Sequence, residues 1–209
     1  MSVAKVLKMI KDKEVKFVDL RFTDTKGKWQ HTAQTASTID ENTFKDGIMF
    51  DGSSIAGWKD INESDMILMP DPNTAVIDPF TAQPQMILFC DVIEPSDGKP
   101  YELDPRSTGK KAEDYLKSSG IGEKCFFGPE AEFFIFDDVK WATNQEYTFF
   151  SIDSEEGAYN TGAEMEGGNM GHRPKDKGGY FPVPPVDSAT DIRAEMVSTM
   201  IEMGLDMEK

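Results

Sequence analysis

The chain has 209 residues, of which 38% are hydrophobic and 11% aromatic, enough to bury one large or two small cores and to exclude a disordered chain. Its 22 Lys and Arg against 38 Asp and Glu give a net charge of −16. That charge repels nucleic-acid phosphates and anionic membrane surfaces, so we expect neither as a partner.

The first residues predict a short amphipathic helix. Apolar side chains recur at helical spacing over residues 3–10, with lysines between them and Ser2 as a possible cap. Neither a signal peptide nor a membrane helix is indicated. Both cysteines, Cys90 and Cys125, lie in apolar runs, as small buried side chains do. We therefore expect a cytoplasmic protein.

The next segments predict a small sheet. Residues 15–22 and 29–35 are rich in β-forming side chains and flank a polar turn, which is typical of a hairpin. One or two helical turns are expected over residues 40–45. Further strands are predicted at residues 66–69, 75–77 and 85–93. The fold class indicated is α+β.

A turn signal at residues 94–98 marks a change of domain. We expect one domain over residues 1–104 and the start of another over residues 105–209. The second would hold a lysine-rich helix at 110–116 and strands at 124–136 and 147–152.

The last part of the chain is glycine-rich and then helical. More than about 15 residues without structure are uncommon in a compact domain unless they serve a site, and residues 157–179 form such a stretch. Asp187 is the expected cap of a helix with an apolar stripe that includes Ile192, Met196 and Met200. We expect that stripe to pack against partners.

Two carboxylates in an apolar segment give the sharpest chemical signal. In a strand, Glu130 and Glu132 would lie on one face, roughly 6.5 to 7 Å apart. Buried carboxylates need compensation, and two divalent cations would suit the transfer of a phosphoryl group. A solvent edge, arginine partners or the acid pair of a glycosidase are the alternatives.

A polar loop gives the second signal. Residues 50–58 combine Asp51, two serines, two glycines and an exposed-looking Trp58, a mixture that presents polar groups for binding. Asp65 closes the acidic stretch that follows. The alternative is an Asx turn with a packed tryptophan. A third stretch, residues 177–185, contains paired glycines before a proline segment and by spacing alone is a loop.

Three motifs, in this order and spacing, resemble the type I glutamine synthetases: FDGSSIAGW at 50–58, GPEAEFF at 128–134 and KGGYFPVPP at 177–185. Residues 164–174, EMEGGNMGHRP, are similar to the longer bacterial β subtype. The resemblance runs over the whole chain. It implies a β-grasp domain at residues 1–104, followed by the beginning of the catalytic α+β domain.

The resemblance also implies the reaction and its participants. These would be ATP-dependent joining of ammonium to L-glutamate through γ-glutamyl phosphate, in a dodecamer of two stacked hexamers with active sites between neighbouring subunits. Asp51 would attract ammonium and take its proton, with Asp65 nearby. Glu130 and Glu132 would each bind one Mg²⁺ or Mn²⁺ ion, and Glu208 would contact the nucleotide.

The family's remaining metal ligands and phosphate-binding arginines are not among these residues. We therefore expect this chain by itself to be inactive. The rival interpretation is a stand-alone β-grasp module that docks onto full-length subunits and regulates them.

Overall fold

The computed structural model describes residues 1–154, 174 and 178–208. The chain divides into two compact units. Unit 1 comprises residues Met1–Phe127 with Met203–Leu205, and unit 2 comprises Gly128–Glu202 with Asp206–Lys209. The domain boundary expected at 104/105 stays a prediction.

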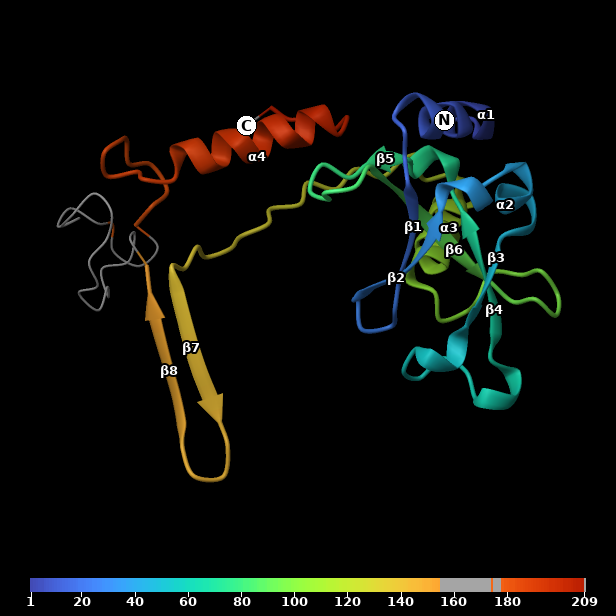
Figure 1. The fold of residues 1–209 in the computed structure, drawn as a ribbon, viewed down its shortest axis with the longest axis horizontal. Helices are drawn as coiled ribbons and strands as arrows, with labels where there is room; N and C mark the ends of the chain where they lie inside the picture. Colours follow the sequence, from blue (N-terminus) through green and yellow to red (C-terminus); the bar gives the residue numbers. More distant parts are fainter. Residues whose placement is uncertain (155–173, 175–177, 209) are drawn as a thin grey trace. The chain divides into compact units, whose positions relative to one another are not determined.

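Unit 1 is a mixed α+β structure (Figure 1). Its helices and strands are α1 (Val3–Asp12), β1 (Phe17–Thr23), β2 (Trp29–Thr35), α2 (Glu41–Asp46), β3 (Ile48–Asp51), β4 (Asp65–Pro70), β5 (Val76–Ile77), β6 (Gln85–Ile93) and α3 (Pro105–Ser119). Every helix and strand expected before residue 120 is present. The Ser2 cap is confirmed, since its hydroxyl accepts a hydrogen bond from the Lys5 amide.

The sheet has the strand order β2-β1-β6-β4-β3, with β5 paired to β6. β1 and β2 form the expected antiparallel hairpin. β1 also pairs in parallel with β6, which arrives much later in the chain and becomes the central strand. That pairing places β4, and through it β3, on the other side of β6.

The core lies between one face of this sheet and the first two helices. Val18 and Leu20 of β1 and Leu88 of β6 are fully buried, as alternation along a half-buried strand requires. Val6 of α1 packs into the same cluster, and Phe44 of α2 packs against it. Cys90 is buried there as expected, but Cys125 is exposed, so that expectation was wrong for the second cysteine.

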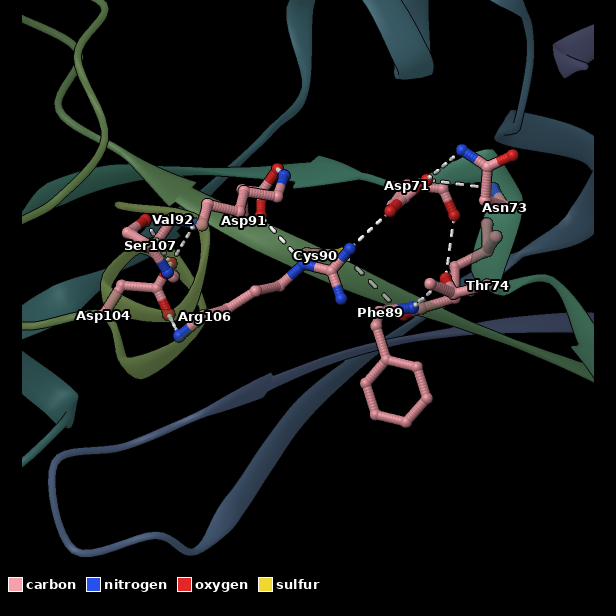
Figure 2. Close-up of polar contacts among 12 residues, drawn as sticks. Asp71, Asn73, Thr74, Phe89, Cys90, Asp91, Val92, Asp104, Arg106 and Ser107 are labelled. Atoms are coloured by element: carbon pink, nitrogen blue, oxygen red, sulfur yellow. Dashed lines mark hydrogen bonds and ion pairs between the residues drawn. The ribbon is translucent and has the colours of Figure 1, made fainter. Parts of the chain in front are cut away.

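Helix α3 is fastened to the sheet by charged side chains at its start (Figure 2). The carboxylate of Asp104 caps the helix and also accepts a hydrogen bond from the amide of Val92 at 3.3 Å. The guanidinium of Arg106 bridges Asp91, at 2.8 Å, and Asp71. These contacts join the helix to β6 and to the end of β4.

In unit 2 the described residues form a hairpin of β7 (Asp138–Thr143) and β8 (Thr148–Asp153), and the helix α4 (Thr190–Glu202). The strand expected at 147–152 is thus confirmed. The strand expected at 124–136 is wrong, because these residues have no ladder partner in the described part of the chain. Without a partner, an apolar segment has extended backbone at most.

The apolar stripe expected on α4 is present but exposed in part, with Ile192 46% and Met196 39% accessible. Asp187 does bond the start of α4, since it accepts hydrogen bonds from Ala189 and Thr190. None of the described helices is both long and apolar enough to cross a membrane.

Candidate functional site

Asp51 and Asp65 are brought together by strand register. Asp51 ends β3, Asp65 begins β4, and the two are direct partners in the antiparallel ladder. Such partners have Cα atoms about 4.5 to 5.5 Å apart. Both side chains are exposed. The chain between them leaves the sheet as an excursion, which we call the Asp51 loop (residues 51–65; Figure 1).

Gly52 closes the base of the Asp51 loop. Its amide donates to the carbonyl of Ser64 at 2.7 Å. A Cβ atom at this position would lie 2.5 Å from the sulfur of Met66, which is fully buried, and 3.1 Å from the Ser64 oxygen. Only glycine allows the two ends of the loop to approach this closely.

The carboxylate of Asp51 is oriented by its own loop. It accepts hydrogen bonds from the Ser53 hydroxyl at 2.6 Å, the Ser53 amide at 2.9 Å and the Ser54 hydroxyl at 3.2 Å. Chiefly through the Ser53 hydroxyl, and then the Ser53 amide, these donors hold the pKa of Asp51 below its usual value of 3.8. Asp51 is therefore an ionised, exposed carboxylate at neutral pH.

Trp58, in the same loop, is buried, with only 7% of its surface accessible. The expectation of an exposed tryptophan was wrong, and the alternative of an Asx turn with a packed tryptophan describes the local structure. That turn does not remove Asp51 from solvent. The Asp51 loop therefore contains both a buried side chain that packs against the domain, Trp58, and an exposed carboxylate, Asp51.

Glu130 and Glu132 lie two residues apart in the extended segment before β7, and both are exposed. Their carboxylate oxygens are the donors that Mg²⁺ and Mn²⁺ prefer. Within the described residues, no group of three or more His, Cys, Asp or Glu side chains is arranged to hold a metal ion. Two carboxylates fit such ions as part of a ligand set, and their metal role stays a prediction.

The other predicted positions are only partly described. Glu208 is exposed beyond the end of α4. In the motif at 177–185, Lys177 lies outside the described residues, while Tyr180 and Phe181 are exposed and in mutual ring contact. The segment 164–173 and most of the glycine-rich stretch lie outside them as well.

Two family models match the chain, one after the other. The model of the glutamine synthetase β-grasp domain matches residues 14–95, and that of the glutamine synthetase catalytic domain matches residues 102–209. The chain belongs to the glutamine synthetase family. The resemblance and the α+β, β-grasp fold class are thereby confirmed.

The relatives agree with this family and show how much of a glutamine synthetase is present. The chain is 60% identical over 208 residues to the glutamine synthetase of Azospirillum brasilense, covering all of this chain and 44% of that protein. It is 56% identical to a 3-hydroxylaminophenol mutase of Cupriavidus pinatubonensis, again covering 44% of that protein. The chain therefore spans less than half the length of these curated relatives.

A solved structure supports the fold. Plasmodium falciparum glutamine synthetase superposes with a TM-score of 0.82 at 23% identity, covering the whole of this chain and 41% of that one. At that identity the likeness concerns the fold.

Sequence reasoning found the acids of the Asp51 loop but missed what holds them. Tyr101 donates its hydroxyl to the carbonyl of Trp58 at 2.8 Å across 43 positions. Lys59 pairs with Glu94 at 2.5 Å. No local spacing signals such contacts. The sequence shows only that two aromatic residues, Trp58 and Tyr101, stand before β4 and after β6, which does not indicate that they touch.

Proposed function

We propose that this chain forms the amino-terminal part of an ATP-dependent glutamate–ammonia ligase. The reaction would join ammonium to the γ-carboxyl of L-glutamate through γ-glutamyl phosphate and give L-glutamine, ADP and phosphate. The observation that carries the proposal is the ladder pairing of Asp51 with Asp65 at the mouth of an exposed loop, in a chain of this family.

Asp51 and Asp65 would form the ammonium side of the reaction. Two adjacent exposed carboxylates attract a small cation. The lowered pKa of Asp51 keeps it charged but also makes it a weaker base. The stronger role of Asp51 would therefore be to attract and orient ammonium. Removal of a proton by Asp51 would become favourable only as the nitrogen attacks the acyl phosphate, because the attacking nitrogen then becomes more acidic.

Glu130 and Glu132 would provide oxygen ligands for two or more Mg²⁺ or Mn²⁺ ions. When bound, such ions neutralise ATP phosphates and the transferring phosphoryl group. Within this chain the two carboxylates would anchor them, Glu132 on the glutamate side and Glu130 on the ATP side. Glu208 would contact the nucleotide.

The assembly we propose is a dodecamer of two stacked hexamers in the cytoplasm. The Asp51 loop would complete the active site of a neighbouring subunit. An exposed acid pair at the base of a loop that leaves the sheet suits that arrangement, because such a loop can enter a site built by another chain.

The test uses the full-length protein that the coding sequence encodes. We expect phosphate release that requires ATP, L-glutamate and ammonium together. Glu132→Ala should lower the rate of phosphate release by more than about 100-fold, and Asp51→Asn should raise the KM for ammonium. Glu146→Ala, at the exposed turn between β7 and β8, is the matched control.

Three results would count against the proposal. Full activity in Glu132→Ala would remove the metal role. Conversion of 3-hydroxylaminophenol without glutamine formation would favour the activity named for the Cupriavidus relative. Binding to full-length subunits without either activity would favour the stand-alone module.

A further inference from the structure

The hydrogen bonds within the Asp51 loop are local, including the three that Asp51 accepts from Ser53 and Ser54. Apart from the closing bond at Gly52, the loop backbone makes short turns, in which Ile55 donates to Gly52 and Trp58 to Ile55, both at 3.1 Å. The two 3₁₀ helices it contains are three residues each. Contacts this local do not fix a loop against the rest of a domain, so its position depends on what holds it from outside.

Trp58 provides the first external hold. Its ring packs 5.1 Å from that of Tyr101 and 5.6 Å from that of Phe22, measured between centroids. Its carbonyl accepts the Tyr101 hydroxyl in a buried hydrogen bond. Burial raises the pKa of Tyr101, so this hydroxyl remains a donor.

Lys59 provides the second. Its ammonium donates to Glu94 at 2.5 Å and lies 5.3 Å from the centre of the Tyr101 ring. The two side chains of the ion pair are only 18% and 24% exposed, so solvent screens it less than a surface pair. The bond to Glu94 raises the pKa of Lys59, which keeps its charge.

The residues that receive the loop are themselves fixed to the sheet. The amide of Tyr101 donates to the carbonyl of Val92 at 2.8 Å, and that of Glu94 to Lys99 at 2.9 Å. Tyr101 and Glu94 thus belong to a turn that continues the central strand β6. The loop is tied to the middle of the sheet by a route separate from β3 and β4.

We infer that Tyr101 and Lys59 are positioning residues for Asp51. By fixing residues 58 and 59 they hold the preceding turn, and with it Ser53 and Ser54, whose donors orient the Asp51 carboxylate. This inference rests on the proposed ammonium role of Asp51. It assigns that role a support more than 40 positions away in the sequence.

The principal variant is Tyr101→Phe, which keeps the ring and removes the hydroxyl. It is made in the full-length protein that the coding sequence encodes, and Tyr115→Phe, on the exposed side of α3, is the control. We expect the KM for ammonium to rise roughly 3- to 10-fold, as for the loss of one hydrogen bond. The KM values for L-glutamate and ATP should change by less than about two-fold.

The ion pair gives a second test. Lys59→Met should raise the KM for ammonium, whereas Lys59→Arg, which keeps the charge, should leave this KM close to the wild-type value. Adding Glu94→Gln to Lys59→Met should raise the KM little further than Lys59→Met alone. Equal effects on all three substrates and on kcat, accompanied by a lowered Tm, would indicate a purely structural contact and overturn the inference.

A third measurement does not depend on activity. Amide hydrogen exchange in residues 52–57 should quicken several-fold in Tyr101→Phe and stay unchanged in Tyr115→Phe. Unchanged exchange would overturn the inference whatever the enzyme assays give. If the wild-type protein has no ligase activity, the proposed function fails. Hydrogen exchange still decides whether Tyr101 holds the Asp51 loop.

Discussion

A single hydroxyl is the main cause of the lowered pKa of Asp51, the carboxylate proposed to bind ammonium. Ser53 donates to Asp51 through both its side chain and its amide, and the side-chain bond is the main cause of the lowered pKa of Asp51. Ser54 adds a weaker bond. The two serines beside Asp51 are therefore part of the site.

We predict that Ser53→Ala raises the pKa of Asp51 toward 3.8, because the carboxylate loses its main donor while the amide bond remains. The measurement is a ¹³C-detected NMR titration of the Asp51 carboxyl. Ser118→Ala, at an exposed position of α3 outside the Asp51 loop, is the control. An unchanged titration in Ser53→Ala would show that the Ser53 hydroxyl is not the main cause of the lowered pKa.

Single residues also show the limit of sequence reasoning. Asp51 could be singled out from a motif and Asp65 from the acidic stretch after it, because a functional site requires particular residue types, and their role stays a prediction. The burial of Trp58 could not be predicted, because it depends on ring contacts with Phe22 and Tyr101, which are distant in the sequence. A tryptophan in a polar loop looks the same in sequence whether it is packed or exposed.

At the scale of the elements, charged side chains hold the start of α3 to the sheet (Figure 2). Arg106 lies between Asp71 and Asp91, whose side chains are 19% and 18% exposed. Removing the guanidinium would leave two partly buried carboxylates with less compensation. Lys110 would remain as a partner for Asp91 alone.

We predict that Arg106→Met lowers the free energy of unfolding by about 1 to 3 kcal/mol. Lys99→Met, which breaks an exposed ion pair with Asp97, should lower the free energy of unfolding much less than Arg106→Met does, because solvent screens the exposed pair. Urea unfolding of both variants decides the matter. Equal losses would mean that the Arg106 bridge behaves like a surface pair.

The start of α4 should be sensitive to acid. Hydrogen bonds from Arg193, and then from Thr190, lower the pKa of Asp187 to about 2. A lowered pKa contributes stability that is present above 3.8 and is lost as pH falls through about 2. The loss should appear in the amide NMR signals of residues 190–193.

The corresponding variant is Asp187→Asn. It should remove most of this pH dependence between about 4 and 2, whereas Asp206→Asn, beyond the helix, should leave it intact. If both variants titrate like the wild type, Asp187 does not stabilise the helix through its charge.

At this scale the sequence predicted elements with local signals and failed where partners are distant. The β1–β2 hairpin and α1 have their turn and cap within a few residues. The parallel pairing of β1 with β6 has no such local signal. Residues 124–136 have strand-forming composition, but composition cannot supply the neighbouring strand that backbone hydrogen bonds require.

At the scale of the whole molecule, the two units differ in how much apolar surface they cover. Unit 1 closes a core around β1, β4 and β6. The described residues of unit 2 expose large apolar side chains, among them Phe133, Phe134, Trp141 and Phe150. Contiguous exposed apolar surface promotes association.

We predict that residues 1–122, expressed alone, are monomeric and unfold cooperatively, because their core is complete. The 209-residue chain should associate with rising concentration and bind a hydrophobic dye. Sedimentation velocity with urea unfolding tests both. A short fragment that is monomeric but melts without cooperativity would show that its core depends on later residues.

The pairing of Asp51 with Asp65 has a consequence for how such proteins vary in evolution. Their spacing comes from the register of β3 with β4 and from the closing bond at Gly52. It does not come from the number of residues between them. Insertions or deletions near residues 60–63 can therefore accumulate across descendants while both acids stay adjacent, so the flanking pair is a better mark of common ancestry than the length of the loop.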